Sequence, residues 1–260
     1  MTRDEFFESI KADCVSEVDF IIELMRVRGC LIDETPQEYY LSDNGHVLDE
    51  KYLNEIFRRY KLGCVENGKI VVLENTRSNQ LLNEFSEKNR VSYPSCWDIW
   101  KGWNCFKRRE HGEKVPVSCL EPFIARYIKA ISACCVLTAG SCDGNHHRSR
   151  KMFIIMDGEE SICWHRLICE KCLVDKFDIC WDENFTAMHF TQKTRYDTYH
   201  EVNKAAEYLY RNRKVIRRIK TDAFSGMSRL YLKKRPSEEI KDIFVEKANK
   251  LFDENISSFV

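Results

Sequence analysis

Residues 122–156 read PFIARYIKAISACCVLTAGSCDGNHHRSRKMFIIM. Pro122 suits the first turn of a helix, and the apolar residues that follow it recur at helical spacing. The runs 134–138 and 152–156 are short and apolar, which is typical of buried strands. Because the loop between them is too short for a parallel crossover, the two strands are expected to pair antiparallel. This stretch therefore predicts an α+β fold.

The segments that follow continue the alternation of helix and strand. Together they predict a mainly antiparallel sheet with helices packed on one face. The expected elements are a helix over 159–174, strands at 177–181 and 187–191, a long helix from 197 with a basic continuation through 218, a strand or hairpin within 223–234, and a last helix over 237–256.

The N-terminal part is expected to be mainly helical. Thr2 and Glu5 form a capping-box pattern that predicts a helix over 3–28, which Gly29 would end. A second helix is predicted near 49–61, and Asn67-Gly68 between extended runs predicts a hairpin.

This order of elements predicts three parts. They are an acidic helical subdomain over 1–90 that contains the hairpin, an irregular Trp-rich connector over 91–118, and an α+β domain with a basic arm over 119–260. The helix and hairpin also fit a winged-helix fragment with Arg58, Arg59 and Lys61 toward DNA. The acidic excess before residue 58 favours a packing role instead.

The composition is that of a globular protein. Hydrophobic residues make up 43% of the 260 residues, and no apolar run approaches the roughly 20 residues that a membrane helix needs. Acidic residues in the first turns argue against an export signal, so a cytoplasmic location without membrane contact is expected. In a reducing compartment the thirteen cysteines are expected to be mostly free thiols.

The charges are strongly segregated although the formal net charge is zero. Residues 1–57 carry 14 acidic and 5 basic side chains, whereas residues 193–235 carry 13 basic and 4 acidic ones. A basic stripe with aromatic neighbours is typical of nucleic-acid binding. The same stripe can instead dock on the acidic part of its own chain. The candidate nucleic-acid-binding residues are Arg211, Arg213, Lys214, Arg217 and Arg218.

The loop 140–147 concentrates reactive side chains between the two predicted strands. Cys142 is a candidate nucleophile that His146 or His147 would activate, and basic residues after the loop would favour its thiolate. Asp143 and Asp157 are alternative ligands for a divalent metal near a strand end. The candidate catalytic set is Cys142, Asp143, His146 and Asp157. Asp143-Gly144-Asn145 also fits a plain hairpin turn.

A zinc site is a further hypothesis for the cysteines. His165, Cys169 and Cys172 stand at i, i+4 and i+7 of a predicted helix, and Cys142 or His146 would complete a tetrahedral shell. The alternative is that these thiols are core residues, because free cysteine is among the most buried residue types.

The segment 127–144 resembles uncharacterised bacterial and phage proteins with a Ser-Cys-Asp-Gly-His loop. The resemblance rests on Tyr127-Ile128-Lys129-Ala130-Ile131, Leu137-Thr138 and Ser141-Cys142-Asp143-Gly144. Asn145 stands where histidine is usual, and His146 follows one position later. A more distant similarity is to the Ser-Ser-Cys-Ser-Gly stretch of the wybutosine-synthesis methyltransferases, which act on transfer RNA. About 30 of the 260 residues are covered, so the resemblance implies no activity.

These observations favour a nucleic-acid-associated protein, with the basic arm on the backbone and the Cys142–His147 loop as a pocket beside it. One alternative is a metal- or thiol-dependent enzyme acting on a small anionic substrate. Another is an interaction protein that assembles through its oppositely charged ends.

Overall fold

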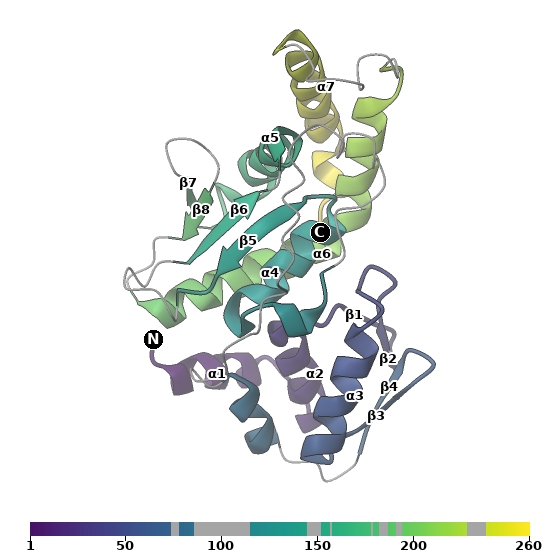
Figure 1. Ribbon diagram of the computed structural model, residues 1–260, viewed down its shortest axis with the longest axis vertical. Coiled ribbons are helices and arrows are strands. Elements are labelled where there is room, and N and C mark those ends of the chain that lie inside the picture. Colours follow the sequence, from purple (N-terminus) through teal and green to yellow (C-terminus); the bar gives the residue numbers. More distant parts are fainter. Residues whose placement is uncertain are drawn as a thin grey trace.

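The computed structural model describes residues 1–73, 78–85, 115–144, 152–156, 158–177, 179–181, 187–190, 194–227 and 238–260 (Figure 1). Helices and two four-stranded antiparallel sheets make up this part of the chain, which confirms the α+β class. Within those residues, none of the helices is both long and apolar enough to cross a membrane. The Trp-rich connector lies largely outside the described residues.

The N-terminal helix is two helices where one was predicted. Helix α1 (Arg3–Ala12) begins with the predicted capping box, but α2 (Glu17–Arg28) starts anew because the Ser16 side chain accepts a hydrogen bond from the backbone N–H of Asp19. Gly29 ends α2 as predicted, with a φ of 111°. A Cβ at this glycine would lie 2.7 Å from the Ala125 Cβ, so the end of α2 lies directly against α4 (Pro122–Ala133).

The first sheet belongs to the acidic N-terminal part of the chain. Its strands are β1 (Ile32–Glu34), β2 (Tyr39–Leu41), β3 (Gly63–Glu66) and β4 (Lys69–Val72), in the order β1-β2-β4-β3, with α3 (Asp49–Tyr60) between β2 and β3 along the chain. The predicted hairpin is confirmed, since Asn67 and Gly68 both have positive φ in the turn of β3 and β4. The short strand β1 was not predicted.

The second sheet begins four residues later than predicted. Helix α4 (Pro122–Ala133) is followed by Cys134 and Cys135, whose backbone N–H groups still bond to helical carbonyls, and Cys135 has a φ of 68°. Strand β5 is therefore Thr138–Cys142 instead of 134–138. This places Cys142 at the end of a strand and not in the middle of a loop.

The remaining strands complete an antiparallel sheet in the order β5-β6-β8-β7. They are β6 (Phe153–Met156), β7 (Ile179–Trp181) and β8 (Ala187–Phe190), and helix α5 (Gly158–Ile168) with the π-helical turn η4 (Cys169–Leu173) follows β6. Along β6, Ile154 and Met156 are buried while Ile155 is 42% exposed, so the described part of this strand packs one face against the core.

Helix α6 (Arg195–Phe224) is the longest helix in the described part of the chain. It packs along α4 and against α7 (Glu238–Asn255), and it also meets α1 (Figure 1). The rings of Phe123 on α4 and Tyr199 on α6 stack with centroids 4.1 Å apart. Ala223 and Phe224 finish this helix instead of starting the predicted hairpin. Short 3-10 helices are η1 (Ser78–Phe85), η3 (Val117–Cys119) and η5 (Ile256–Ser258).

The cysteines whose side chains the structure describes are free thiols, as predicted. They are Cys14, Cys30, Cys64, Cys119, Cys134, Cys135, Cys142, Cys163, Cys169 and Cys172.

Candidate functional site

Three of the five predicted nucleic-acid-binding residues are exposed on α6. The side chain of Arg211 is 65% exposed and pairs with Glu207 one turn earlier. Lys214 and Arg218 are exposed, and the Arg218 Nη2 donates a hydrogen bond of 2.8 Å to the Asn255 Oδ1. Positions 211, 214 and 218 lie on one side of the helix, because residues three, four and seven apart are neighbours on a helical surface.

The other two basic residues face the acidic N-terminal part of the same chain. The Arg213 Nη2 lies 2.8 Å from the Asp33 Oδ1, and its guanidinium lies 3.9 Å from the centre of the Tyr210 ring. The Arg217 Nη1 donates a hydrogen bond of 2.8 Å to the Asn44 Oδ1. The basic arm is thus divided, and the internal docking left open by the sequence takes place at Arg213 and Arg217.

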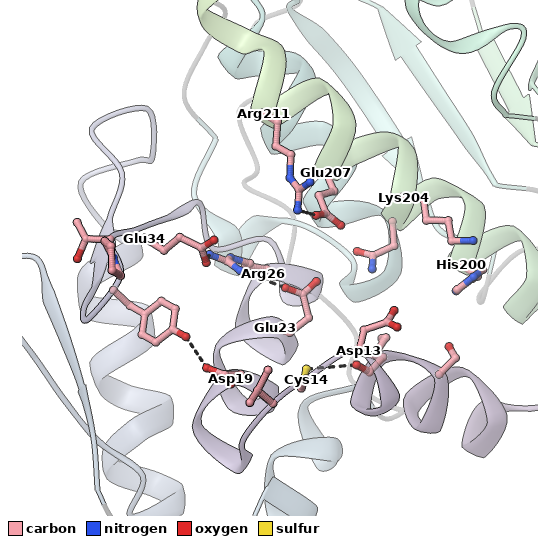
Figure 2. A pocket seen from close by; sticks show the side chains of 17 residues that line it. Asp13, Cys14, Asp19, Glu23, Arg26, Glu34, His200, Lys204, Glu207 and Arg211 are labelled. Carbon is pink, nitrogen blue, oxygen red and sulfur yellow. Dashed lines mark hydrogen bonds and ion pairs between the residues drawn. The ribbon is translucent and has the colours of Figure 1, made fainter. Parts of the chain in front are cut away.

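A charged groove lies where α6 faces α1 and α2 (Figure 2). Its volume is about 870 Å³. Its charged lining residues are Asp13, Asp19, Glu23, Arg26, Glu34, Lys204, Glu207 and Arg211, together with His200. This groove was not predicted. The segregation of charge along the sequence was a signal for it, but only the fold shows which acidic and basic side chains share a cavity.

Ion pairs cross one end of the groove. Arg26 lies 2.7 Å from Glu34 and 3.4 Å from Glu23. The Arg126 Nη1 of α4 also lies 2.5 Å from the Glu23 Oε1, and the Arg126 side chain is largely buried. On the other side of these pairs is a second cavity of about 590 Å³, which Arg213 and Lys214 help to line. The pairs therefore divide one charged seam into two cavities.

Cys142 and Asp143 meet a residue that the sequence did not single out, Glu121. The Asp143 backbone N–H donates a 2.6 Å hydrogen bond to the Glu121 Oε2, and the Tyr199 hydroxyl donates to the Asp143 carbonyl at 3.1 Å. Ligand atoms of Glu121, Cys142 and Asp143 lie within 4.8 Å of one another, and all three residues are buried. The sequence indicated Glu121 only through its position directly before Pro122, at the start of the predicted helix.

The chemistry of this cluster follows from its burial. Burial raises the pKa of the Cys142 thiol to about 12, against the opposing effect of a hydrogen bond from the Gly144 backbone N–H. The thiol is therefore protonated at neutral pH, which does not favour a nucleophile. Two carboxylates and a thiol are donors suited to a divalent metal such as zinc, which would displace that proton. His146 and Asp157, the other members of the predicted catalytic set, lie outside the described residues.

The predicted zinc ligands do not form one shell. Among the described residues, Glu121, Cys142 and Asp143 are the only group of three or more metal-ligating side chains with their donor atoms this close together, so Cys142 is not grouped with His165, Cys169 and Cys172. The π-helical turn η4 provides a physical reason. A wider turn changes the helical register from residue 169 onward, so positions 165, 169 and 172 no longer keep ideal i, i+4 and i+7 spacing.

His165 instead belongs to a buried hydrogen-bonded cluster. Its Nε2 lies 2.9 Å from the Tyr127 hydroxyl and 3.7 Å from the Cys169 thiol. Burial lowers the pKa of His165 to about 3 and raises the pKa of Cys172 to about 12. Neutral imidazole, phenol and thiol groups form a polar core network, with no charge at physiological pH.

This network predicts a pH dependence of stability. The pKa of His165 is about 3 in the folded chain and about 6.5 when unfolded, so the unfolded state binds more protons between these values. The free energy of unfolding is expected to fall by about 2 kcal/mol between pH 7 and pH 5 through this histidine. Urea denaturation at both pH values checks this in the wild type and in His165→Gln. The variant should show a smaller loss on acidification, and an equal loss would contradict the assignment.

Comparison with known proteins adds no family to these observations. The chain matches no family model, and no curated protein or solved structure matches it.

Proposed function

We propose that this protein binds nucleic acid, with the exposed basic side of α6 contacting the phosphate backbone. The observation that carries the proposal is that Arg211, Lys214 and Arg218 point to solvent from one side of a long helix. They span about 10 Å of the helix at 1.5 Å per residue, which suits contact with neighbouring phosphates.

The charges on this side of α6 are only partly compensated. Arg211 pairs with Glu207, whereas Lys214 and Arg218 form no ion pair with any other residue of the described segments. Surface cations without an internal partner can neutralise phosphate groups, and the counterions that the nucleic acid then releases favour binding. Arg213 and Arg217 support this surface from within, because their contacts to Asp33 and Asn44 hold α6 against the N-terminal part.

The proposal predicts that the double charge reversal Lys214→Glu and Arg218→Glu weakens binding of a labelled oligonucleotide at least about tenfold at physiological salt. The plot of log K against log salt concentration has a negative slope, and the magnitude of this slope should decrease by about two, one for each lost phosphate contact. Fluorescence anisotropy with single- and double-stranded oligonucleotides measures both quantities. Arg217 is left unchanged because its loss would disturb the packing of α6 on Asn44.

The matched control is the double reversal Lys51→Glu and Arg58→Glu on α3. These residues are also exposed, seven positions apart, and carry the same charge change. Both double variants should unfold within about 0.5 kcal/mol of the wild type. Salt-independent binding, an unchanged affinity of the α6 variant, or a loss confined to the α3 variant would each contradict the proposed surface.

A further inference from the structure

The two long walls of the groove in Figure 2 differ in the sign of the charges that no ion pair within the protein compensates. The wall formed by α1, α2 and their linker presents the carboxylates of Asp13, Asp19 and Glu23. The wall formed by α6 presents Lys204, whose side chain lies beside His200 in Figure 2. Burial and the nearby charge of Lys204 lower the pKa of His200, so Lys204 is the cationic group of this wall. A cavity, rather than direct ion pairs, separates these walls at this end of the groove.

Some of these charges are already used within the protein. Glu23 is held by Arg126 and Arg26, and Arg211 is held by Glu207. By contrast, Asp13, Asp19 and Lys204 form no ion pair with another residue in the part of the chain that the structure describes. The groove thus offers two anionic groups on one side and a cationic group on the other.

Asp19 is fixed as an anion in this groove. The Tyr39 hydroxyl donates a 2.5 Å hydrogen bond to its Oδ1, and the Ser16 hydroxyl donates to its Oδ2 at 2.8 Å. The hydrogen bond from Tyr39 is the main reason that the pKa of Asp19 lies below its usual value. These contacts orient the carboxylate without neutralising it, which leaves its charge for an occupant.

We propose that the groove binds a zwitterionic ligand of peptide size, with its ammonium group at Asp13 and Asp19 and its carboxylate at Lys204. A ligand of a single sign would compensate one wall and leave the other wall desolvated and unpaired, which costs free energy. The volume of about 870 Å³ is within the usual range for ligand cavities and exceeds what one amino acid would fill.

Apolar groups between the charged walls suit the body of such a ligand. Ile10, Val15 and Pro36 line the groove, and Val15 is 98% exposed in the linker between α1 and α2. A peptide that lies between the walls would cover this side chain. The site does not depend on Lys214 and Arg218, so the two proposals are tested by different residues.

The test is calorimetric titration of the full chain with tetraalanine. The free peptide, its N-acetylated form, its C-amidated form and the doubly blocked form are compared. The free peptide is expected to bind with a Kd of about 1 mM or tighter, and each single block should weaken binding about three- to fivefold. Absence of binding at about 10 mM, or equal affinity for the free and doubly blocked peptides, would overturn the proposal.

Two charge reversals test the assignment of each wall. Lys204→Glu should weaken binding of the C-amidated peptide least, since that peptide has no carboxylate to pair with Lys204, and Asp13→Lys should repel the ammonium group. The double variant Asp13→Lys with Lys204→Glu exchanges the charges of these two positions while Asp19 stays anionic, and it should recover part of the binding of the free peptide in the opposite direction. Both residues are exposed, so folding is expected to be retained. A double variant weaker than both single variants would contradict the proposed orientation.

Discussion

Replacing Lys129 by methionine is expected to lower the free energy of unfolding by about 3–5 kcal/mol. The Lys129 Nζ lies 2.5 Å from the Asp49 Oδ2 and 2.6 Å from the Val115 carbonyl, and its side chain is only 1% exposed. Methionine keeps most of the alkyl stem but leaves a buried carboxylate without its cation. Urea denaturation at neutral pH measures the loss.

The reason for so large an effect is the position of Asp49. Its carboxylate also accepts hydrogen bonds from the backbone N–H groups of Val117 and His46, both at 2.9 Å, and it therefore joins the start of α3 to the segment before α4. The matched control is Lys250→Met, whose partner Glu254 is 3.9 Å away at the surface. That change should alter stability by less than about 0.5 kcal/mol. Equal losses in the two variants would show that the buried pair has no special role.

Gly63→Ala is the second substitution expected to have a large effect. Gly63 opens β3 with a φ of 144°, and a Cβ built on it would lie 1.9 Å from the carbonyl oxygen of Val71 on the paired strand. Strand pairing cannot be kept at that separation, so the hairpin must shift. A loss of about 3 kcal/mol or more in the free energy of unfolding is expected by thermal or urea denaturation.

Gly68→Ala separates steric clash from backbone strain. Gly68 has a φ of 79° in the turn of the same hairpin, but a Cβ there would meet nothing within 4 Å. This variant should lose about 1 kcal/mol, the cost of the positive φ alone. If both alanine variants lost the same amount, contact with Val71 would not be the cause.

Local signals predicted the elements whose ends are set by their own residues. The Thr2 capping box, the Gly29 helix end and the Asn67-Gly68 turn are each determined by side chains or backbone freedom within a few positions. The break at Ser16 was missed because apolar residues continue at helical spacing through it. The late start of β5 was missed because Cys134 and Cys135 are as apolar as a strand requires, while their backbone completes the turn after α4.

The candidate site was predicted less completely than the fold. Charge alone does not distinguish Arg213, which faces Asp33, from Lys214, which faces solvent. Helical spacing offered that distinction, because Arg213 lies one turn before the buried Ile216. Glu121 joins Cys142 and Asp143 through tertiary packing, for which neighbouring residues carry no signal.

The central place of α6 also determines when the protein can finish folding during synthesis. Helices α1 and α2 leave the ribosome long before α6, whose first residue is Arg195. At 5–20 residues per second, the wait between the end of α2 and the start of α6 lasts roughly 10–30 s. During this interval Tyr196, beside which the finished fold buries Phe6, has not yet been synthesised. The nascent N-terminal part is therefore expected to need protection from aggregation until α6 emerges.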